Sequence, residues 1–280
     1  MDERDDERSE LLAEVRAHLD WEAAWSGFPV PLIDGPRPLV ETSGNETAMP
    51  AAPSRSAGVP ETPAGASFPA AAAAAPTPSS PSMAEALAAL APEDRVGRLR
   101  VLADEAARCT RCRLHEGRTR SVFARGSGQA RLAFVGEGPG YNEDQQGLPF
   151  VGAAGQLLDK MVGAMGLGRD DVYVCNVVKC RPPENRTPLP DEAGACSIYL
   201  VPQLEIVQPE VIVALGRCAA ENLGVAEAGR SWRGRWGAYR GVPVMPTYHP
   251  AYLLRSPEMK KPVWEDLQLV MQRLGLKRGE

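Results

Sequence analysis

Four short apolar runs, each followed by a helical pattern, constrain the fold of this chain more than any other feature. The runs are Leu132–Val135, Val172–Val178, Val211–Leu215 and Val242–Pro246. The helical patterns that follow them cover residues 153–165, 191–207, 217–223 and 263–275. Buried strands that alternate with helices are typical of a parallel sheet covered on both faces. We therefore expect an α/β fold with three layers, α/β/α, around a central four-stranded parallel sheet.

Polar side chains and a glycine-rich turn follow the ends of these runs. Glu137 lies in the turn Gly136–Gly140 after the first run, Asn176 lies near the end of the second, and His249 follows the fourth. Ligands of open α/β sheets bind beyond the carboxyl ends of the strands, which predicts one crevice here. The turn lacks the G-x-G-x-x-G spacing and no G-K-[ST] follows it, which excludes a dinucleotide fingerprint and a P-loop. Taken alone, the turn is also compatible with a purely structural role.

Four of the six cysteines form two separated pairs. A C-x-x-C pair is followed much later by two cysteines with fifteen residues between them: Cys109, Cys112, Cys180 and Cys196. Four thiolates suit one soft-metal centre, either an iron–sulfur cluster or zinc. The wide second spacing favours a cluster, because zinc ribbons usually use two C-x-x-C pairs. Cys175 and Cys218 lie within or just after apolar strands, and we expect them to be small buried residues.

The charge of the chain is unevenly distributed. The net charge of -5 combines -10 over residues 1–95 with +5 over residues 96–280. A basic body fits a nucleic-acid partner, and an ordinary solvated surface is the alternative on charge alone. No apolar run can span a bilayer and the acidic N-terminus lacks an apolar signal region, so we expect a cytoplasmic chain without membrane contact. Nothing indicates an obligate oligomer, and we expect a monomer.

Composition predicts three segments. Residues 7–25 form an amphipathic pattern, and the segment 1–33 is a candidate docking peptide for a protein partner; alternatively, this helix packs on the body. Residues 34–82 are rich in Pro, Ala and Ser, and we expect a disordered linker. Residues 83–280 form the folded domain, beginning with a helix over 83–108 that leads to Cys109.

The stretch from Cys109 to Leu274 resembles the family 4 uracil-DNA glycosylases, the iron–sulfur type of bacteria and archaea. The resemblance lies in G-E-G-P-G-Y-N-E-D, G-L-P-F-V-G-A-A-G-Q-L-L, N-V-V-K-C-R-P-P-E-N-R-T-P-L-P-D-E-A and H-P-A-Y-L-L-R. It implies a uracil-DNA glycosylase-like domain that hydrolyses the N-glycosidic bond of deoxyuridine by base flipping, in single- and double-stranded DNA. This reaction initiates base excision repair, which implies a location at the nucleoid. It also implies one structural [4Fe–4S] cluster held by Cys109, Cys112, Cys180 and Cys196.

The resemblance assigns roles to single residues. Phe150 stacks on uracil, Asn176 reads O4 and N3–H, and His249 donates to O2 as negative charge builds there. Glu137 holds the attacking water, and Glu143 lies near uracil C5, where it helps to exclude the thymine methyl group. The further substrate-binding residues are Gly138, Pro139 and Gly140 of the glycine turn, Asn185 of a later loop, and Arg255, which meets a phosphate or fills the vacated space. Leu253 and Leu254 are candidate DNA wedges, and we expect one of the two to belong to the core instead.

Basic residues around these motifs are candidate phosphate contacts: Lys179, Arg181, Arg186, Arg233, Arg235 and Arg240. Two alternatives to the main interpretation stay open. One is a DNA glycosylase of broader specificity that accepts, for example, hypoxanthine. The other is a cluster-bearing DNA-binding or polymerase-associated module without turnover. The joint presence of Glu137, Phe150, Asn176 and His249 favours an enzyme, because binding alone does not require all four.

Overall fold

The computed structural model of the chain describes residues 92–226 and 232–277. The expected docking peptide 1–33, the expected linker 34–82 and the expected start of the domain at residue 83 lie outside the described residues. The helix expected over 83–108 is present as α3 (Pro92–Ala107) within the described part.

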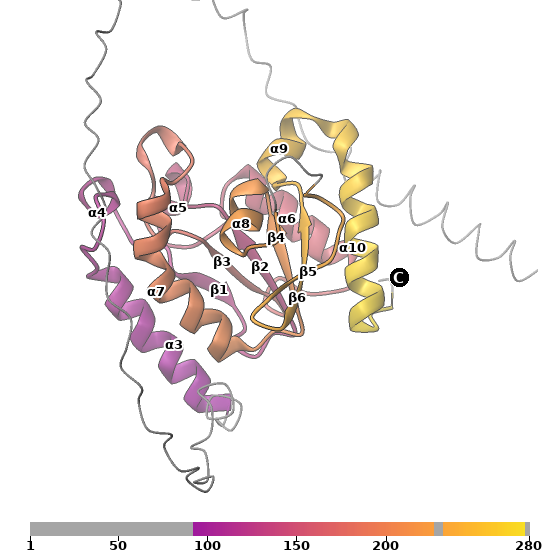
Figure 1. The fold of residues 1–280 in the computed structure, drawn as a ribbon, viewed down its shortest axis with the longest axis horizontal. Helices are drawn as coiled ribbons and strands as arrows, with labels where there is room; N and C mark the ends of the chain where they lie inside the picture. Colours follow the sequence, from indigo (N-terminus) through magenta and orange to yellow (C-terminus); the bar gives the residue numbers. More distant parts are fainter. Residues whose placement is uncertain (1–91, 227–231, 278–280) are drawn as a thin grey trace, which may run out of the picture. The chain divides into compact units, whose positions relative to one another are not determined.

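The domain is built on a six-stranded sheet with the order β1-β3-β2-β4-β6-β5 (Figure 1). Its four inner strands are the predicted apolar runs, and they pair in parallel: β2 (Leu132–Gly136), β3 (Tyr173–Asn176), β4 (Val211–Leu215) and β6 (Val242–Thr247). Two three-residue strands, β1 (Ala124–Gly126) and β5 (Gly237–Tyr239), pair antiparallel at the edges. The predicted four-stranded parallel core is confirmed, whereas the edge strands are too short to leave an alternating pattern in the sequence.

Both faces of the sheet are covered, which explains why its inner strands are apolar throughout. Leu132 and Phe134 of β2 pack with helices α6 (Ala153–Ala164), α9 (Pro250–Arg255) and α10 (Lys260–Leu274). The intervening Ala133 and Val135 pack with α3, α7 (Pro190–Val207) and α8 (Arg217–Asn222). Successive side chains of a strand point to opposite faces, so each inner strand feeds two cores. The predicted α/β/α layering is confirmed.

Four short helical elements lie in the connections between the longer helices and the strands. They are α4 (Leu114–Gly117), α5 (Tyr141–Gln146) and two 3-10 turns, η1 (Pro183–Asn185) and η2 (Pro257–Met259). Each is shorter than two helical turns, so the sequence carries no usable periodicity for it. Within the described residues, no helix has both the length and the apolar character needed to cross a membrane.

Candidate active site and cysteine cavity

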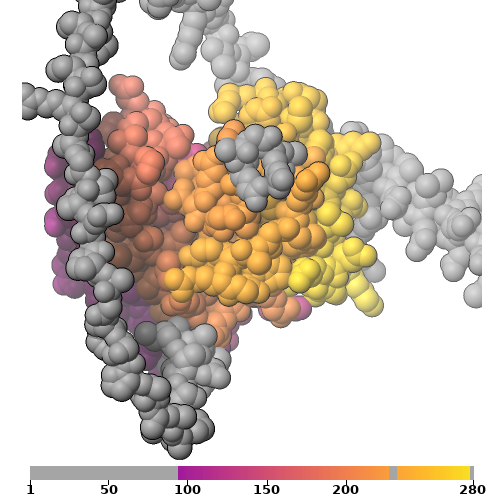
Figure 2. Space-filling model, in the orientation of Figure 1, coloured from indigo at the N-terminus to yellow at the C-terminus, as the bar shows by residue number. Residues whose placement is uncertain are grey.

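A pocket of about 500 Å³ lies at the carboxyl ends of the parallel strands. Most of the predicted site residues line it: Glu137–Gly140, Glu143, Phe150, Asn176, Asn185, His249 and Arg255. The loop before α7 and helix α9 form opposite walls, and Figure 2 shows a notch between these two segments. Segments that are more than a hundred residues apart in sequence therefore converge, as the strand-end argument predicts.

Asn176 ends β3 and carries an unpaired polar atom. The residue is only 2% exposed, and its Oδ1 accepts no hydrogen bond from any group in the described part of the chain. Gly136 makes the room for it, because a Cβ at that position would stand 2.4 Å from Asn176 Oδ1 and 2.7 Å from Phe150 Cζ. A buried carbonyl oxygen without a donor is costly, and it marks a place where a ligand donor is expected.

Phe150 is held in the pocket by a strained and well-supported loop. Its φ of 56° lies in the left-handed region, which is uncommon for a bulky residue. The backbone N–H groups of Val151 and Gly152 both donate to Glu143 Oε1, at 2.9 Å each. Glu143 thus fixes the loop that presents the phenyl ring. Strain retained by such contacts is typical of a functional position.

His249 is the N-cap residue of α9, and its hydrogen bond defines its protonation. The backbone N–H of Ala251 donates to Nδ1 at 3.1 Å, so Nδ1 is unprotonated and Nε2 carries the ring proton. Burial, aided by the charge of Arg255, lowers the pKa of His249 from 6.5 to about 4. The ring also stacks near Phe150, with centroids 5.5 Å apart and planes inclined by 28°. At neutral pH the pocket therefore contains an uncharged imidazole whose Nε2–H is a hydrogen-bond donor.

Glu137 follows β2 directly and faces the pocket as a half-buried carboxyl group. Burial raises its pKa above 4.5, and a hydrogen bond with the side chain of Thr187 opposes this shift. The Glu137 carbonyl accepts from the backbone N–H of Val178 at 3.2 Å, which extends the pairing of β2 and β3 past their ends. The carboxyl group is therefore fixed from two neighbouring segments.

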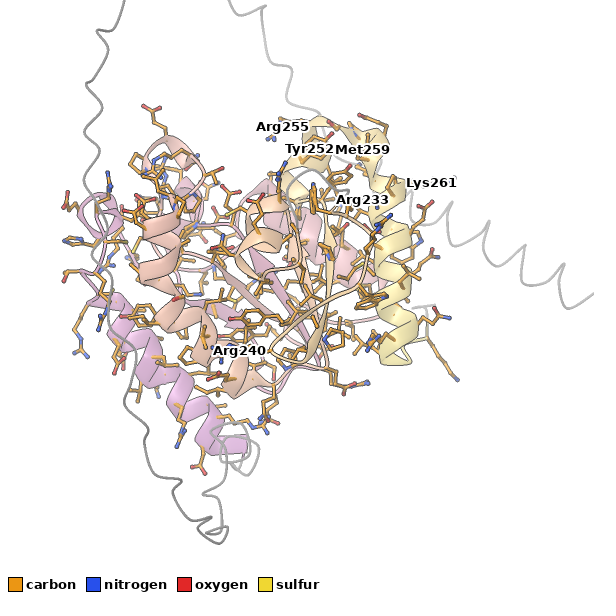
Figure 3. All side chains as sticks on the ribbon, in the orientation of Figure 1. Arg233, Arg240, Tyr252, Arg255, Met259 and Lys261 are labelled. Atoms are coloured by element: carbon orange, nitrogen blue, oxygen red, sulfur yellow. The ribbon has the colours of Figure 1, made fainter. Side chains whose placement is uncertain are left out.

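Five pocket-lining residues were missed by the sequence analysis. Thr187 and Tyr252 have polar side chains, and the other three are Ala154, Pro182 and Ala251. Thr187 belongs to an irregular loop, and its contact with Glu137 leaves no sequence signal. Tyr252 projects from α9 close to Arg255 (Figure 3). It stands three residues after His249, a helical spacing that brings side chains to one side of a helix and that could have identified it.

The two predicted wedge leucines have different positions. Leu253 is fully buried, and it packs in the core shared by α6, α9 and α10. Leu253 is therefore the leucine of the pair that belongs to the core, and it is not available as a DNA wedge, because the 3.6-residue period of α9 turns it inward. Leu254 is only partly buried, and it lies outside the lining of the pocket.

Several predicted phosphate contacts have other partners. Lys179 is 1% exposed, and its Nζ donates to the carbonyl oxygen of Asn176 at 2.7 Å, so it cannot reach solvent. Arg186 forms a bidentate pair with buried Glu192, at 2.8 and 2.7 Å. Arg240 pairs with Glu205 and lies at the opposite end of the sheet from Tyr252 and Arg255 (Figure 3).

The remaining basic candidates differ in their access to the pocket. Arg233 donates to Asp266 at 2.7 Å, and Arg235 is exposed but does not line the pocket. Arg181 donates to Asn185 Oδ1 at 2.7 Å and lies over the ring of Tyr141, 5.2 Å from its centroid. Among these cations only Arg186 and Arg255 line the pocket, and Arg186 is already paired with Glu192.

A second cavity brings the four predicted cysteine ligands together: Cys109, Cys112, Cys180 and Cys196. Arg118 Nη1 donates to Cys180 Sγ at 3.0 Å, and the backbone N–H of Lys179 donates to Cys196 Sγ at 3.3 Å. Burial raises the pKa of the Cys196 thiol to about 11, against the opposing charge of Lys179. Metal binding at this cavity must therefore displace thiol protons, as it does in other thiolate sites.

The cysteine cavity contains no preformed position for a single ion. Across the described ranges, no three His, Cys, Asp or Glu side chains converge on one ion position. All six cysteines are free thiols. Cys175 and Cys218 are buried outside this cavity, which confirms the prediction for both.

Comparison with known proteins places this chain within one family. Residues 123–268 match the family model described as Uracil DNA glycosylase superfamily. The type-4 uracil-DNA glycosylase of Thermotoga maritima is 44% identical over 181 residues, which are 61% of this chain and 91% of that protein. The type-4 uracil-DNA glycosylase of Archaeoglobus fulgidus is also 44% identical over 181 residues, 61% of this chain and 90% of the relative. That of Saccharolobus solfataricus is 41% identical over 190 residues, 64% and 88% of the two chains. The chain therefore belongs to the type-4 uracil-DNA glycosylase family.

Proposed function

We propose that the strand-end pocket holds a uracil flipped out of DNA while its N-glycosidic bond is hydrolysed. The observation that carries this proposal is the buried, unpaired Oδ1 of Asn176 in the same pocket as the neutral N–H donor of His249. The substrate is single- or double-stranded DNA containing deoxyuridine, and the products are free uracil and an abasic site. The enzyme is monofunctional and initiates base excision repair.

Asn176 reads the edge of the base. Its Oδ1 accepts from uracil N3–H and its amide N–H₂ donates to O4, which satisfies the carbonyl that the free protein leaves unpaired. Cytosine has an unprotonated N3 and an amino group at the same positions. The Oδ1 of Asn176 would then face an acceptor, and its N–H₂ group would face a donor. Unpaired polar groups in a buried pocket strongly reject such an analogue.

His249 stabilises the departing base. Its Nε2–H donates to uracil O2, where negative charge accumulates as the glycosidic bond breaks. Because the pKa of His249 is about 4, the ring acts as a neutral donor and transfers no proton. One such donor contributes roughly 3 kcal/mol of transition-state stabilisation.

Glu137 acts on the sugar side of the bond. As a carboxylate it orients a water molecule, accepts its proton as the new bond to C1′ forms, and offsets the positive charge on the sugar. The hydrogen bond from Thr187 stabilises the ionised form against the effect of burial. This balance keeps the carboxylate available in a partly buried position.

Phe150 and Glu143 shape the slot for the base. The phenyl ring stacks on uracil, and a base–aromatic contact is worth roughly 1–3 kcal/mol. Glu143 lies along the wall between Gly140 and the Phe150 loop that it fixes, which narrows the space beside C5 and helps to exclude the thymine methyl group. Gly138, Pro139 and Gly140 let the backbone approach the flipped nucleotide closely.

The DNA backbone is held at the rim of the pocket. Arg255 contacts a phosphate or fills the space that the flipped base vacates, and Leu254 is the remaining candidate wedge. Asn185, fixed by Arg181, borders the same opening.

The four cysteines Cys109, Cys112, Cys180 and Cys196 hold one structural [4Fe–4S] cluster. Four thiolates suit this group, and the donors from Arg118 and from the Lys179 backbone offset their negative charge. The cluster would tie the segment after α3 to the loop after β3. Quantifying iron and sulfide in anaerobically purified protein tests this assignment, and fewer than about three irons per chain would contradict it.

The N-terminal third has a separate role. The segment 1–33 docks a protein partner, residues 34–82 link it to the domain, and residues 83–280 act as a monomeric glycosylase domain that works on DNA in the nucleoid. Deletion of residues 1–82 is expected to leave excision unchanged. A truncated protein that folds and keeps its cluster but does not excise uracil would make the tail part of the enzyme.

The pocket assignment is tested with oligonucleotides that contain one uracil, using wild-type protein and Glu137→Gln. The wild type is expected to release free uracil and to leave a site that breaks only in alkali. Glu137→Gln is expected to bind the same DNA with unchanged affinity and to excise at least a hundredfold more slowly. Equal rates for the two proteins would remove Glu137 from the reaction.

A further inference from the structure

One buried lysine contacts both the uracil pocket and the cysteine cavity. Lys179 is 1% exposed, and its Nζ donates to the carbonyl oxygen of Asn176 at 2.7 Å. Its backbone N–H donates to Cys196 Sγ at 3.3 Å, and its neighbour in the chain is Cys180. Lys179 therefore lies three residues after Asn176, the proposed uracil reader, and directly before Cys180, a proposed cluster ligand.

The charge of Lys179 has no carboxylate partner in the described part of the chain, where none of the ion pairs includes it. Its Nζ lies 5.9 Å from the centroid of the Phe123 ring, which is a weak substitute. A buried ammonium group is costly unless opposite charge lies nearby. Lys179 lines the cysteine cavity, so the thiolates of a metal centre bound there would supply that charge.

The charges balance when the cysteine cavity holds its cluster. An oxidised four-iron cluster with four thiolate ligands carries a net charge of about minus two. Lys179 and Arg118 supply two positive charges beside it, the latter with Nη1 3.0 Å from Cys180 Sγ. A cluster bound in the cysteine cavity would therefore compensate the charge of the buried lysine.

The contact with Asn176 fixes the peptide plane that aims the amide. Past the end of β3, the N–H of Val177 donates to the carbonyl of Gly136 at 2.9 Å, and the carbonyl of Asn176 itself receives Lys179. A recognition group must be held to within about 0.5 Å and 10–20°. The hydrogen bond from Lys179 supplies that restraint on the backbone of Asn176.

We propose that Lys179 is a positioning residue for uracil recognition: its buried ammonium group fixes Asn176, while its backbone and charge tie it to the cysteine site. The geometry of the amide that reads uracil then depends on the occupied cysteine cavity. This inference rests on the proposed function, because it takes Asn176 as the reader.

Two variants of the cluster-containing protein, Lys179→Met and Lys179→Gln, test the proposal. Both remove the charge, and glutamine keeps a shorter N–H donor. Iron content, kcat/KM on uracil DNA and inhibition by free uracil are measured on each. We expect full iron content, a Ki for free uracil at least fivefold above the wild-type value and kcat/KM at least tenfold lower. The inhibition constant reports on the pocket without contributions from the DNA backbone.

A double variant separates positioning from a general effect on the fold. If Lys179 acts through Asn176, adding Lys179→Met to Asn176→Ala should change kcat/KM by less than threefold. Arg125→Met is the matched control, since Arg125 is a buried cation that pairs with Asp159 away from the pocket. This control is expected to leave the Ki for uracil unchanged.

Three results would overturn the proposal. In the first, Lys179→Met protein that retains its cluster has the wild-type Ki for free uracil. In the second, the effects of Lys179→Met and Asn176→Ala on kcat/KM add in the double variant. In the third, both Lys179→Met and Lys179→Gln lose the cluster. The last result would make Lys179 a structural part of the cysteine site. Failure of the proposed function appears separately, as absence of uracil excision by the wild-type protein.

Discussion

Replacing Asn176 with alanine should change activity and stability differently. In the free protein the Oδ1 of Asn176 is buried without a hydrogen-bond donor, so this side chain adds little to folding. In the complex we expect it to make two hydrogen bonds to uracil. The substitution therefore removes binding energy that exists only with substrate.

The magnitude follows from these two hydrogen bonds. At roughly 1–1.5 kcal/mol each, their loss amounts to about 2–3 kcal/mol, or about a 30- to 150-fold lower kcat/KM. An unpaired buried polar atom costs roughly 1–3 kcal/mol, and its removal offsets the packing lost on truncation. We therefore expect an unchanged or raised Tm for Asn176→Ala.

Single-turnover excision from a labelled oligonucleotide with one uracil measures the activity, and thermal unfolding measures the stability. Asn222→Ala is a matched control, because Asn222 bonds to the carbonyl of Cys218 on α8 and does not line the pocket. This control should keep wild-type kcat/KM. An Asn176→Ala variant that excises uracil within threefold of the wild-type rate, or that loses stability in proportion to its activity, would refute the reasoning.

Three further predictions concern the other parts of the two sites. His249→Ala should lower excision by roughly a hundredfold, the value of one transition-state donor, with unchanged cluster absorbance; equal turnover would remove His249 from the mechanism. Thr187→Val should move the acid limb of the pH profile of kcat/KM to higher pH, because the hydrogen bond that this change removes lowers the pKa of Glu137. The pKa of His249 lies near 4, and the substitution does not alter a contact of that ring. An acid limb at the wild-type pH would assign the limb to a group other than Glu137. Cys180→Ala should lose cluster and fold together, and a variant with full iron content would refute the ligand assignment.

The sequence predicts the parallel core because each inner strand is buried on both faces and therefore apolar throughout. The same logic predicts the meeting of Glu137, Asn176 and His249, since the carboxyl ends of parallel strands share one edge. The short strands β1 and β5 leave no such pattern, because they have only three residues each.

Side-chain direction and pairing are harder to predict from the sequence. Leu253 and Leu254 are adjacent and chemically identical, and only the rotation of α9 turns the first into the core. Lys179 has a positively charged side chain, which predicts a phosphate contact, yet the turn after β3 directs this side chain inward to the carbonyl oxygen of Asn176. Thr187 reaches Glu137 through an irregular loop, and such contacts depend on tertiary structure rather than on local pattern.

The most direct test of the account is base-specific excision. Wild-type protein, purified anaerobically without added metal, is incubated with labelled oligonucleotides that carry a single uracil, hypoxanthine or thymine. The pocket geometry predicts alkali-sensitive cleavage at uracil alone. Cleavage at hypoxanthine as fast as at uracil, or no cleavage at any base by protein that retains its cluster, would contradict it.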